Sequence, residues 1–255
     1  MQHRPDQAKT IAIKINDGLA GSSSSADHTD VGVQTWGASI VMCQMMCDAP
    51  SRFGLDRGQL GDSPRIVELG AGTGVVSLVM AQLLPRYLSV QNPTLVATDY
   101  HPGVMTNLRG NIAMNDDDSA ATVHACTLDW AHSESLEQQM DWPLDKMHGY
   151  GGCADMLVAT DVVYEKEHAA LLRDCAARLL APGGTFWLLQ TVRSNGRFGE
   201  YADAVESAFP MAGVGKLQVG GNTSLKVLEA ERLEKKTGVG RGDETFYRLF
   251  RIGWA

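Results

Sequence analysis

The sequence lacks long apolar runs, both in its interior and near its start. No stretch approaches the roughly 18 consecutive apolar residues that a membrane-spanning helix needs. The chain begins with the polar segment 1–7 and has no apolar run behind it, unlike a secretory signal. We therefore expect a chain that neither spans a membrane nor is secreted.

Paired cysteines are also lacking. The five cysteines are an odd number, are widely scattered and form no C-x-x-C pair, which argues against a disulfide framework. This usage is typical of a reducing compartment, so we expect a cytoplasmic protein, with the nucleus as the alternative. Cys43 and Cys47 lie four residues apart on an expected helix and are interpreted as core residues. The histidines show no metal-ligand spacing, and we expect no metal.

Basic residues are few relative to acids. The chain has 22 Lys and Arg against 30 Asp and Glu, a formal net charge of -8. This balance disfavours loose electrostatic binding to nucleic acid or to an anionic membrane. We expect neither as a partner.

From residue 65 onward, short apolar segments alternate with segments of helical spacing. This alternation predicts an α/β fold with a parallel sheet and right-handed crossovers. Strands are expected at 65–69, 94–98, 122–128, 154–159, 185–192, 225–228 and 245–252, and helices at 74–84, 102–114, 166–180 and 198–209.

The residues before 65 are interpreted as an N-terminal extension. Apolar and polar residues alternate over 10–15 and again over 31–36, which predicts the two strands of a β-hairpin. A helix is expected over 38–47, followed by a loop rich in Gly and Asp. We expect a single domain overall, with 1–64 packed on a core of 65–255.

The glycine-rich segment after the first core strand is the strongest signal in the chain. Residues 67–74 read V-E-L-G-A-G-T-G, and glycines at alternate positions let a strand turn sharply into a helix and let a ligand approach the backbone. The spacing differs from the dinucleotide pattern G-x-G-x-x-G. Glu68, two residues before the first of these glycines, disfavours a diphosphate and favours a cationic ligand. S-adenosylmethionine, a sulfonium nucleoside, fits both the loop and the charge.

Asp99 ends the next expected strand. A carboxylate at this position can accept two hydrogen bonds from a ribose diol. A lone Asp at a strand end is otherwise more often a turn former. Asp99 and the glycine segment together predict a nucleoside-containing ligand.

Two tryptophans offer an aromatic surface for such a ligand. Trp130 follows the third core strand and is expected at the carboxyl edge of the sheet, where ligands of open α/β sheets bind. Its indole can pack on adenine. The alternative is that Trp130 fills an apolar gap under the following loop. Trp36, at the start of the first helix, poses the same choice, with a cover over the cofactor as its functional interpretation.

The segment D-V-V-Y, from Asp161 to Tyr164, leaves the fourth core strand at the same edge. An acid and a tyrosine three residues apart can line a narrow channel beside a reactive methyl group, where transfer depends on alignment and exclusion of water. Asp161 can orient an acceptor amine, and Tyr164 can shape the channel. The alternative is a helix N-cap at Asp161 and a packed aromatic at Tyr164.

Taken together, these motifs resemble the seven-strand class I methyltransferases. More narrowly, they resemble methyltransferase family 16, the group that contains the methyltransferase-like 21 type protein lysine methyltransferases. The resemblance covers about residues 10–255 and implies a Rossmann-like, doubly wound, mostly parallel sheet of seven strands. The segments that carry it are W-G-A from Trp36, E-L-G-A-G-T-G from Glu68, T-D at Thr98, L-D-W from Leu128 and D-V-V-Y from Asp161.

The resemblance also implies a function and a role for each matching residue. It implies an S-adenosylmethionine-dependent methyltransferase in which Asp161 and Tyr164 border the channel for the acceptor lysine of a protein substrate. Thr160 stands where the group commonly has alanine. Cofactor contacts are implied for Trp36, Glu68, Gly70, Ala71, Gly72, Asp99, Trp130 and Thr160. We expect a monomer.

Two other functions stay open at this point. One is a small-molecule or nucleic-acid N-methyltransferase, in which D-V-V-Y would replace an N-P-P-Y type motif that holds a planar amine. The two prolines of that motif are absent here. The other is a catalytically inactive cofactor-binding adaptor.

Overall fold

The computed structural model of the protein describes residues 10–18, 32–135, 153–193, 203–212, 224–235, 238, 240, 242 and 244–255. The strands are β1 (Arg65–Leu69), β2 (Thr94–Asp99), β3 (Val123–Thr127), β4 (Ala154–Thr160), β5 (Leu180–Arg193), β6 (Leu225–Glu234) and β7 (Glu244–Trp254). The helices are α2 (Gly37–Asp48), α3 (Arg57–Leu60), α4 (Val75–Tyr87), α5 (Pro102–Asn115), α7 (Lys166–Leu179) and α8 (Ala204–Ala208), with 3-10 turns η1 (Pro50–Phe53), η2 (Asp116–Asp118) and η3 (Trp130–Ser135).

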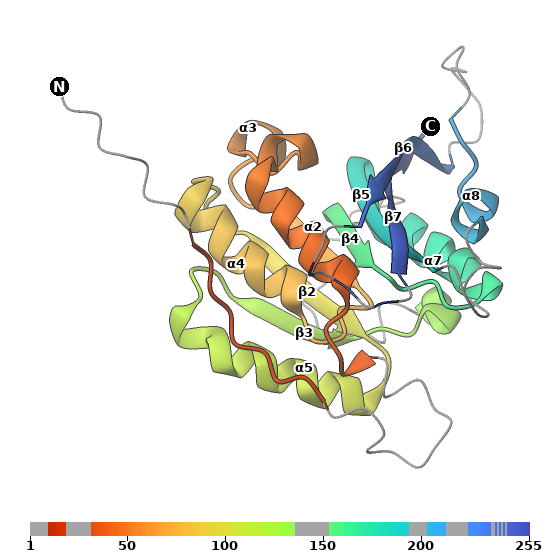
Figure 1. Cartoon of the computed structure of the whole chain (residues 1–255). Helices are drawn as coiled ribbons and strands as arrows, with labels where there is room; N and C mark the ends of the chain where they lie inside the picture. The colour runs from red at the N-terminus through yellow and green to blue at the C-terminus, as the bar shows by residue number, and fades with distance from the viewer. Residues whose placement is uncertain are drawn as a thin grey trace.

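The strands form a seven-stranded sheet in the order β3-β2-β1-β4-β5-β7-β6 (Figure 1). The first five strands pair in parallel, whereas β7 runs antiparallel to both β5 and β6. The predicted α/β fold with a seven-stranded, mostly parallel sheet is therefore confirmed. The direction in which successive strands are added to the sheet reverses between β1 and β4, and this reversal places a crevice at the carboxyl ends of the two strands.

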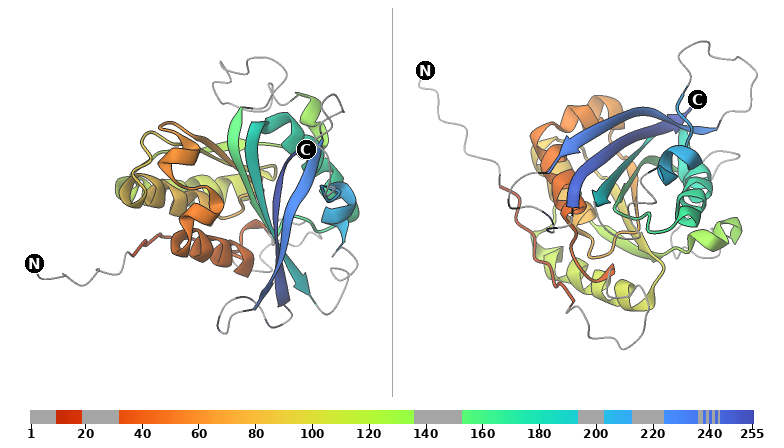
Figure 2. Two further views of the ribbon diagram at one scale, coloured as in Figure 1. Left: turned by 90° about the horizontal axis from the view of Figure 1, so that it is seen from above. Right: turned by 45° about the vertical axis from the view of Figure 1, so that its right-hand side comes forward.

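Helices cover both faces of the sheet, as Figure 2 shows. The core on one side contains residues of α2, α4 and α5, and the core on the other side contains residues of α7 and α8. Neighbouring strand residues point to opposite sides: Ile66 belongs to the first core and Val67 to the second. This explains why the central strands read as continuous apolar runs instead of alternating with polar residues.

Helix α4 is buried along nearly its whole length. Ten consecutive residues from Val75 to Leu84 are buried, because the helix packs on the sheet and against the neighbouring helix α2. Its polar Gln82 is buried as well and donates from Nε2 to the carbonyl of Ala12 at 2.9 Å. The apolar sequence of α4 on all sides therefore reflects a central helix of the fold.

The predicted N-terminal hairpin is wrong. Among the described residues of that region, neither 10–18 nor 32–36 forms a strand. Ile11, Ile13 and Ile15 pack on the core as their alternation requires. The backbone beside them, however, bonds to side chains of α4 and α5, so the segment is an extended strap without a strand partner (Figure 1, red).

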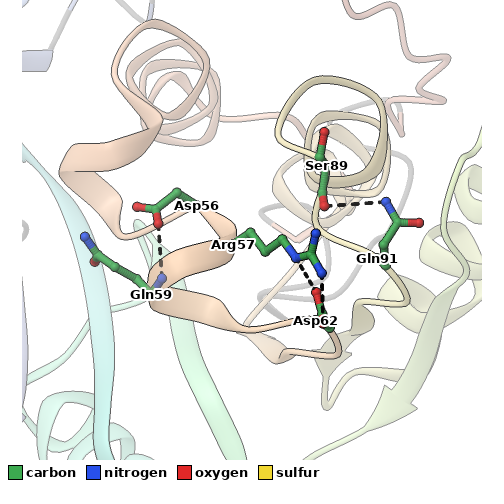
Figure 3. A network of polar contacts seen from close by, with 6 residues as sticks. All are labelled: Asp56, Arg57, Gln59, Asp62, Ser89 and Gln91. Atoms are coloured by element: carbon green, nitrogen blue, oxygen red, sulfur yellow. Dashed lines mark hydrogen bonds and ion pairs between the residues drawn. The ribbon is translucent and has the colours of Figure 1, made fainter.

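The predicted loop between α2 and β1 contains short helical turns. Asp56 caps α3 by accepting from the amide of Gln59 at 3.1 Å, and Arg57 binds Asp62 through Nε at 2.5 Å and Nη2 at 3.1 Å (Figure 3). Both partners of this ion pair are more than half exposed, so it adds little to stability. The turns were missed because each is only about one helical turn long and leaves no periodicity to detect.

Several predicted elements near the C-terminus differ in length from the observed ones, and strand β5 begins at Leu180, five residues before its predicted start. Strand β6 continues to Glu234, past the predicted end at 228. Its charged residues suit a sheet edge, and Glu229 forms an ion pair with Arg251 of β7 at 3.3 Å. Helix α8 occupies part of the predicted helix 198–209, and residues 198–202 lie outside the described residues. The division of the chain at residue 64 stays a prediction.

A pair of leucines tests the assignment of the core. Leu172 on α7 is 0% exposed, whereas Leu228 on the edge strand is 37% exposed. Leu172→Ala should lower the free energy of unfolding by about 2–5 kcal/mol, because it leaves a cavity in the packed layer. The matched control Leu228→Ala should cost less than about 1 kcal/mol. Urea denaturation measures both, and equal losses would contradict the assignment.

Candidate functional site

A cavity of about 270 Å³ opens at the carboxyl ends of β1, β2 and β4. All but two of the sequence-predicted site residues line it. The lining members are Trp36, Gly70, Ala71, Gly72, Asp99, Trp130, Thr160 and Tyr164. The two that do not line it, Glu68 and Asp161, are buried beside it at 3% exposure each.

The glycine segment forms the floor of this cavity. Gly70 has a φ of +67°, and a Cβ on it would lie 2.7 Å from Cγ1 of Val162 and 3.5 Å from Cζ2 of Trp130. A side chain at this position would therefore both strain the backbone and enter the space between two cavity walls. The turn is held by a hydrogen bond from the Ala71 amide to the carbonyl of Thr98 at 2.7 Å.

Asp99 presents a carboxylate to the cavity from the end of β2. Its Oδ2 accepts from the amide of Gly72 at 3.2 Å, and its Oδ1 accepts from the amides of Tyr100 at 2.8 Å and His101 at 3.3 Å. Burial raises the pKa of Asp99, while these amides oppose the shift. The carboxylate is thus fixed in place, and Oδ2 retains the capacity to accept a further hydrogen bond from a ligand.

Trp130 begins η3 and forms an aromatic wall of the cavity. Its neighbour Asp129 also lines the cavity, but that carboxylate accepts from the Ala131 amide at 2.9 Å and pairs with Nδ1 of His132 at 2.8 Å. The Trp130 ring, which follows β3, thus lies near the turn at the end of β1, although β2 separates these strands in the sheet.

Glu68 lies beneath the cavity and caps helix α4. One carboxylate oxygen accepts from the Ser77 amide at 2.9 Å and from the Ser77 hydroxyl at 2.5 Å. Ser77 is in the first turn of the helix, whose amides have no partner within the helix. Burial raises the pKa of Glu68 to about 7, so neutral pH leaves a substantial fraction protonated. The observed contacts of Glu68 thus serve the turn from β1 into α4.

Asp161 turns away from the cavity and toward β5. Its φ of +57° is in the left-handed region, and its amide donates to the carbonyl of Leu189 at 2.8 Å. The carboxylate accepts from the Thr191 amide at 3.1 Å and from Nη2 of Arg193 at 2.8 Å. Burial raises the pKa of Asp161, and the Arg193 guanidinium opposes that shift. The motif acid is therefore one half of a buried ion pair, with both side chains about 5% exposed.

Arg193 joins this ion pair to the cavity wall. Its guanidinium carbon lies 5.2 Å from the centre of the Trp36 ring, within the range of a cation–π contact. Arg193 was missed in the sequence, although a signal was present. It is the last residue of β5, so the rule that singled out Asp99 and Asp161 at carboxyl ends of parallel strands applies to it equally.

Tyr164 lines the cavity and packs against His168 of α7, with ring centres 6.2 Å apart in an edge-to-face arrangement. Burial raises the pKa of Tyr164, and the nearby carboxylates of Asp161 and Asp99 act in the same direction. The hydroxyl therefore stays protonated across the physiological range. His168 and Leu171 also line the cavity and were missed. Leu171 was assigned to the core by its helical spacing, and His168 was considered only as a metal ligand.

The arrangement suits binding and alignment of a ligand. The cavity combines a bare glycine turn, a fixed carboxylate and indole walls, which are features that hold a nucleoside. Within the described ranges, no three His, Cys, Asp or Glu side chains are grouped as metal ligands. No helix of the described part of the chain has the length and apolarity to cross a bilayer.

Comparison with known proteins identifies relatives. The model of a family described as lysine methyltransferase matches residues 22–206, more than two thirds of the chain. Protein-lysine N-methyltransferase EFM2 of Saccharomyces cerevisiae is 28% identical over 168 residues, which cover 64% of this chain and 37% of that protein. EEF1A lysine methyltransferase 3 of Mus musculus is 24% identical over 176 residues, 69% of this chain and 62% of that protein. The chain thus spans less than two thirds of the length of either relative.

Solved structures show more distant similarity. Fibrillarin of Aeropyrum pernix with natively bound S-adenosyl-L-methionine matches at a TM-score of 0.48 and 14% identity, over 85% of this chain and 76% of that one. The fold assignment rests on the strand order described above.

Glu68 provides a test by pH. Its pKa is about 7 in the folded protein against an ordinary 4.5, so between these values the folded state holds a proton that the unfolded state has lost. The free energy of unfolding therefore falls as the pH rises through this window. Glu68→Gln keeps an oxygen acceptor for Ser77 but cannot ionise. The urea midpoint of Glu68→Gln minus that of the wild type should increase as the pH rises from about 5 to about 8. A difference that stays constant over this range would refute the shifted pKa.

The Asp161–Arg193 pair provides a second test. Asp161→Asn tolerates the left-handed backbone but removes the carboxylate that pairs with the buried charge of Arg193, so the free energy of unfolding should fall by about 3–5 kcal/mol. Adding Arg193→Met removes that charge and should restore most of the loss. Urea denaturation of the single and double variants gives both values. A single variant as stable as the wild type would show that the pair carries no such energy.

Proposed function

Because the chain belongs to the lysine methyltransferase family, we propose that it transfers a methyl group from S-adenosylmethionine to a lysine side chain of a protein substrate. The observation that carries the proposal is the match of the family model over residues 22–206, which include the residues that form the cavity. The residues before and after this range add the strap and the antiparallel end of the sheet.

The residues that line the cavity fit this cofactor. Asp99 offers an acceptor for a ribose hydroxyl, Trp130 a face for adenine, and the turn at Gly70 an approach to backbone free of side chains. Asp99 lines the cavity and gives it a negative surround, whereas Glu68 is partly protonated at neutral pH and Asp161 is paired with Arg193. Such a surround is compatible with a sulfonium and unfavourable for a diphosphate.

When bound, the cofactor supplies an electrophilic methyl group on sulfur. The chain itself supplies alignment and exclusion of water, because a direct displacement needs no covalent enzyme intermediate. Trp36 forms part of the cavity wall, and the Arg193 guanidinium, which is paired with Asp161, packs on its ring. Asp161 in this proposal acts as a positioning residue through Arg193 and Trp36, instead of contacting the amine as its motif position suggested.

The acceptor amine must arrive as a free base, since an ammonium has no lone pair to attack the methyl group. Tyr164 lines the cavity with a hydroxyl that stays protonated, and it can accept a hydrogen bond from the amine or donate one to a neighbouring acceptor. Thr160 lines the same cavity from the end of β4 and remains a proposed cofactor contact. Tyr164 therefore borders the proposed path of the lysine.

The partner in this proposal is a lysine-bearing protein, and the chain acts on it as a monomer. Charged residues on the edge strand β6, among them Glu229 and Glu231 with their arginine partners, oppose strand-to-strand pairing of two copies. The net charge of -8 disfavours a nucleic-acid substrate. A reducing compartment, the cytoplasm or the nucleus, is favoured because none of the five cysteines is in a disulfide bond.

Transfer of a tritiated methyl group from S-adenosylmethionine tests the proposal. The purified chain is incubated with cell lysate, and acid hydrolysis of the labelled protein should release methyl-lysine. Label in nucleic acid or small molecules would favour the alternative transferase, and no label despite cofactor binding in calorimetry would favour an adaptor.

Asp99→Ala, which removes the proposed ribose acceptor, should weaken cofactor binding by about 1.5–3 kcal/mol. Unchanged affinity would refute the ribose assignment.

A further inference from the structure

An extended segment of the N-terminus, residues 10–17, is held at its start by side chains of α4 and from Lys14 onward by one face of helix α5. We call it the N-terminal strap (Figure 1, red). Asn115 accepts from the Lys14 amide at 2.8 Å and donates to the Lys14 carbonyl at 2.7 Å, and Asn111 accepts from the Asn16 amide at 2.8 Å. Asn107, one turn earlier, donates to the carbonyl of Asn16 at 3.1 Å. Three asparagines spaced four apart thus take the place of a partner strand.

Asn111 links the strap to the floor of the cavity. It is fully buried, and its Nδ2 donates to the carbonyl of Thr73 in the glycine turn at 3.0 Å. The same side chain accepts from the amide of Asn16. One residue of α5 is therefore hydrogen-bonded to both the strap and the glycine turn.

Asp17 links the end of the strap to residues 32–36, which we call the cover segment. Its Oδ1 accepts from the amide of Thr35 at 2.9 Å and from the Thr35 hydroxyl at 2.6 Å. That hydroxyl lies 3.1 Å from the hydroxyl of Thr73. The amide of Gly18 donates to the carbonyl of Val33 at 2.8 Å. The cover segment is thus tied to the strap and to the glycine turn at once.

The cover segment is itself a wall of the cavity. Gly32, Gln34 and Trp36 line the cavity, and the carbonyl oxygen of Gly32 lies 3.0 Å from the position a Cβ on Gly72 would occupy. Neither Asp17 nor Asn111 is among the lining residues. Any effect of these two residues on a ligand must therefore act through the cover segment and the glycine turn.

We propose that Asp17 and Asn111 are positioning residues that hold the cover segment against the glycine turn before the ligand arrives. The inference rests on the proposed function, since it takes the S-adenosylmethionine site as the site that is organised. A wall that is already in place spares the ligand the entropic cost of ordering it, so affinity depends on these contacts. By the same linkage, a bound ligand stabilises the strap.

Binding of S-adenosylhomocysteine to the full chain, measured by calorimetry, tests this inference. Asp17 is exposed, so Asp17→Ala should leave the thermal midpoint nearly unchanged while it weakens affinity about five- to tenfold. Asp17→Asn keeps an oxygen that can accept from Thr35 and should restore most of the affinity. The matched control Asp56→Ala removes a half-buried aspartate that caps α3, and it should leave affinity unchanged.

Hydrogen exchange of the unliganded protein provides a readout that needs no ligand. Asp17→Ala should speed exchange of the amides in residues 32–36 and in the glycine turn, while exchange in α7 stays the same. Unchanged affinity and unchanged exchange in Asp17→Ala would overturn the inference, as would an equal loss of affinity in Asp56→Ala. If Asp17→Ala speeds exchange as expected but the wild type binds no S-adenosylhomocysteine, the proposed function would be overturned, while the role of Asp17 in holding the cover segment would stand.

Discussion

Parallel pairing of β1 with β2 and β4 is the constraint on which the site depends. Leu69 pairs with Thr98, and Glu68 pairs with Ala97 and with Val158, so the strands end at one edge of the sheet. Parallel strands require crossover helices, and each strand therefore ends in a turn that exposes backbone at this edge. The glycine turn, Asp99 and Thr160 reach a common cavity because of this register, although they are far apart in the chain.

Asp99, Glu68 and Asp161 have different roles near the cavity, and the partners of each buried carboxylate determine its role. Asp99 is held by three backbone amides and faces the cavity. Glu68 caps α4, and Asp161 forms a buried pair with Arg193. A buried carboxylate must find a cation or hydrogen-bond donors, or take up a proton, because isolated charge is costly in a protein interior. The pair at Asp161 meets this requirement while its arginine supports Trp36.

The N-terminal strap connects this chemistry to a part of the chain that precedes the core. Its alternating isoleucines pack on the core as those of a strand would, and the asparagines of α5 satisfy its backbone. Helix α5 carries Asn107, Asn111 and Asn115 because the face toward the strap has to supply donors and acceptors. Through Asn111 and Asp17 the same contacts reach the glycine turn and the cover segment.

The sequence by itself determined the alternation of strands and helices, the nucleoside-type turn at Gly70 and the gathering of Asp99, Trp130 and Tyr164 at one edge. These features follow from local periodicity, glycine conformation and the geometry of parallel sheets. Only the tertiary structure decided that residues 10–15 form a strap, that Glu68 is a cap and that Asp161 faces Arg193. A strand pattern does not specify the partner of the segment, and the partner of the Lys14 amide, Asn115, is 101 residues away in the sequence. The direction of a carboxylate depends on its hydrogen-bond donors, and Arg193, the donor to Asp161, is 32 residues away.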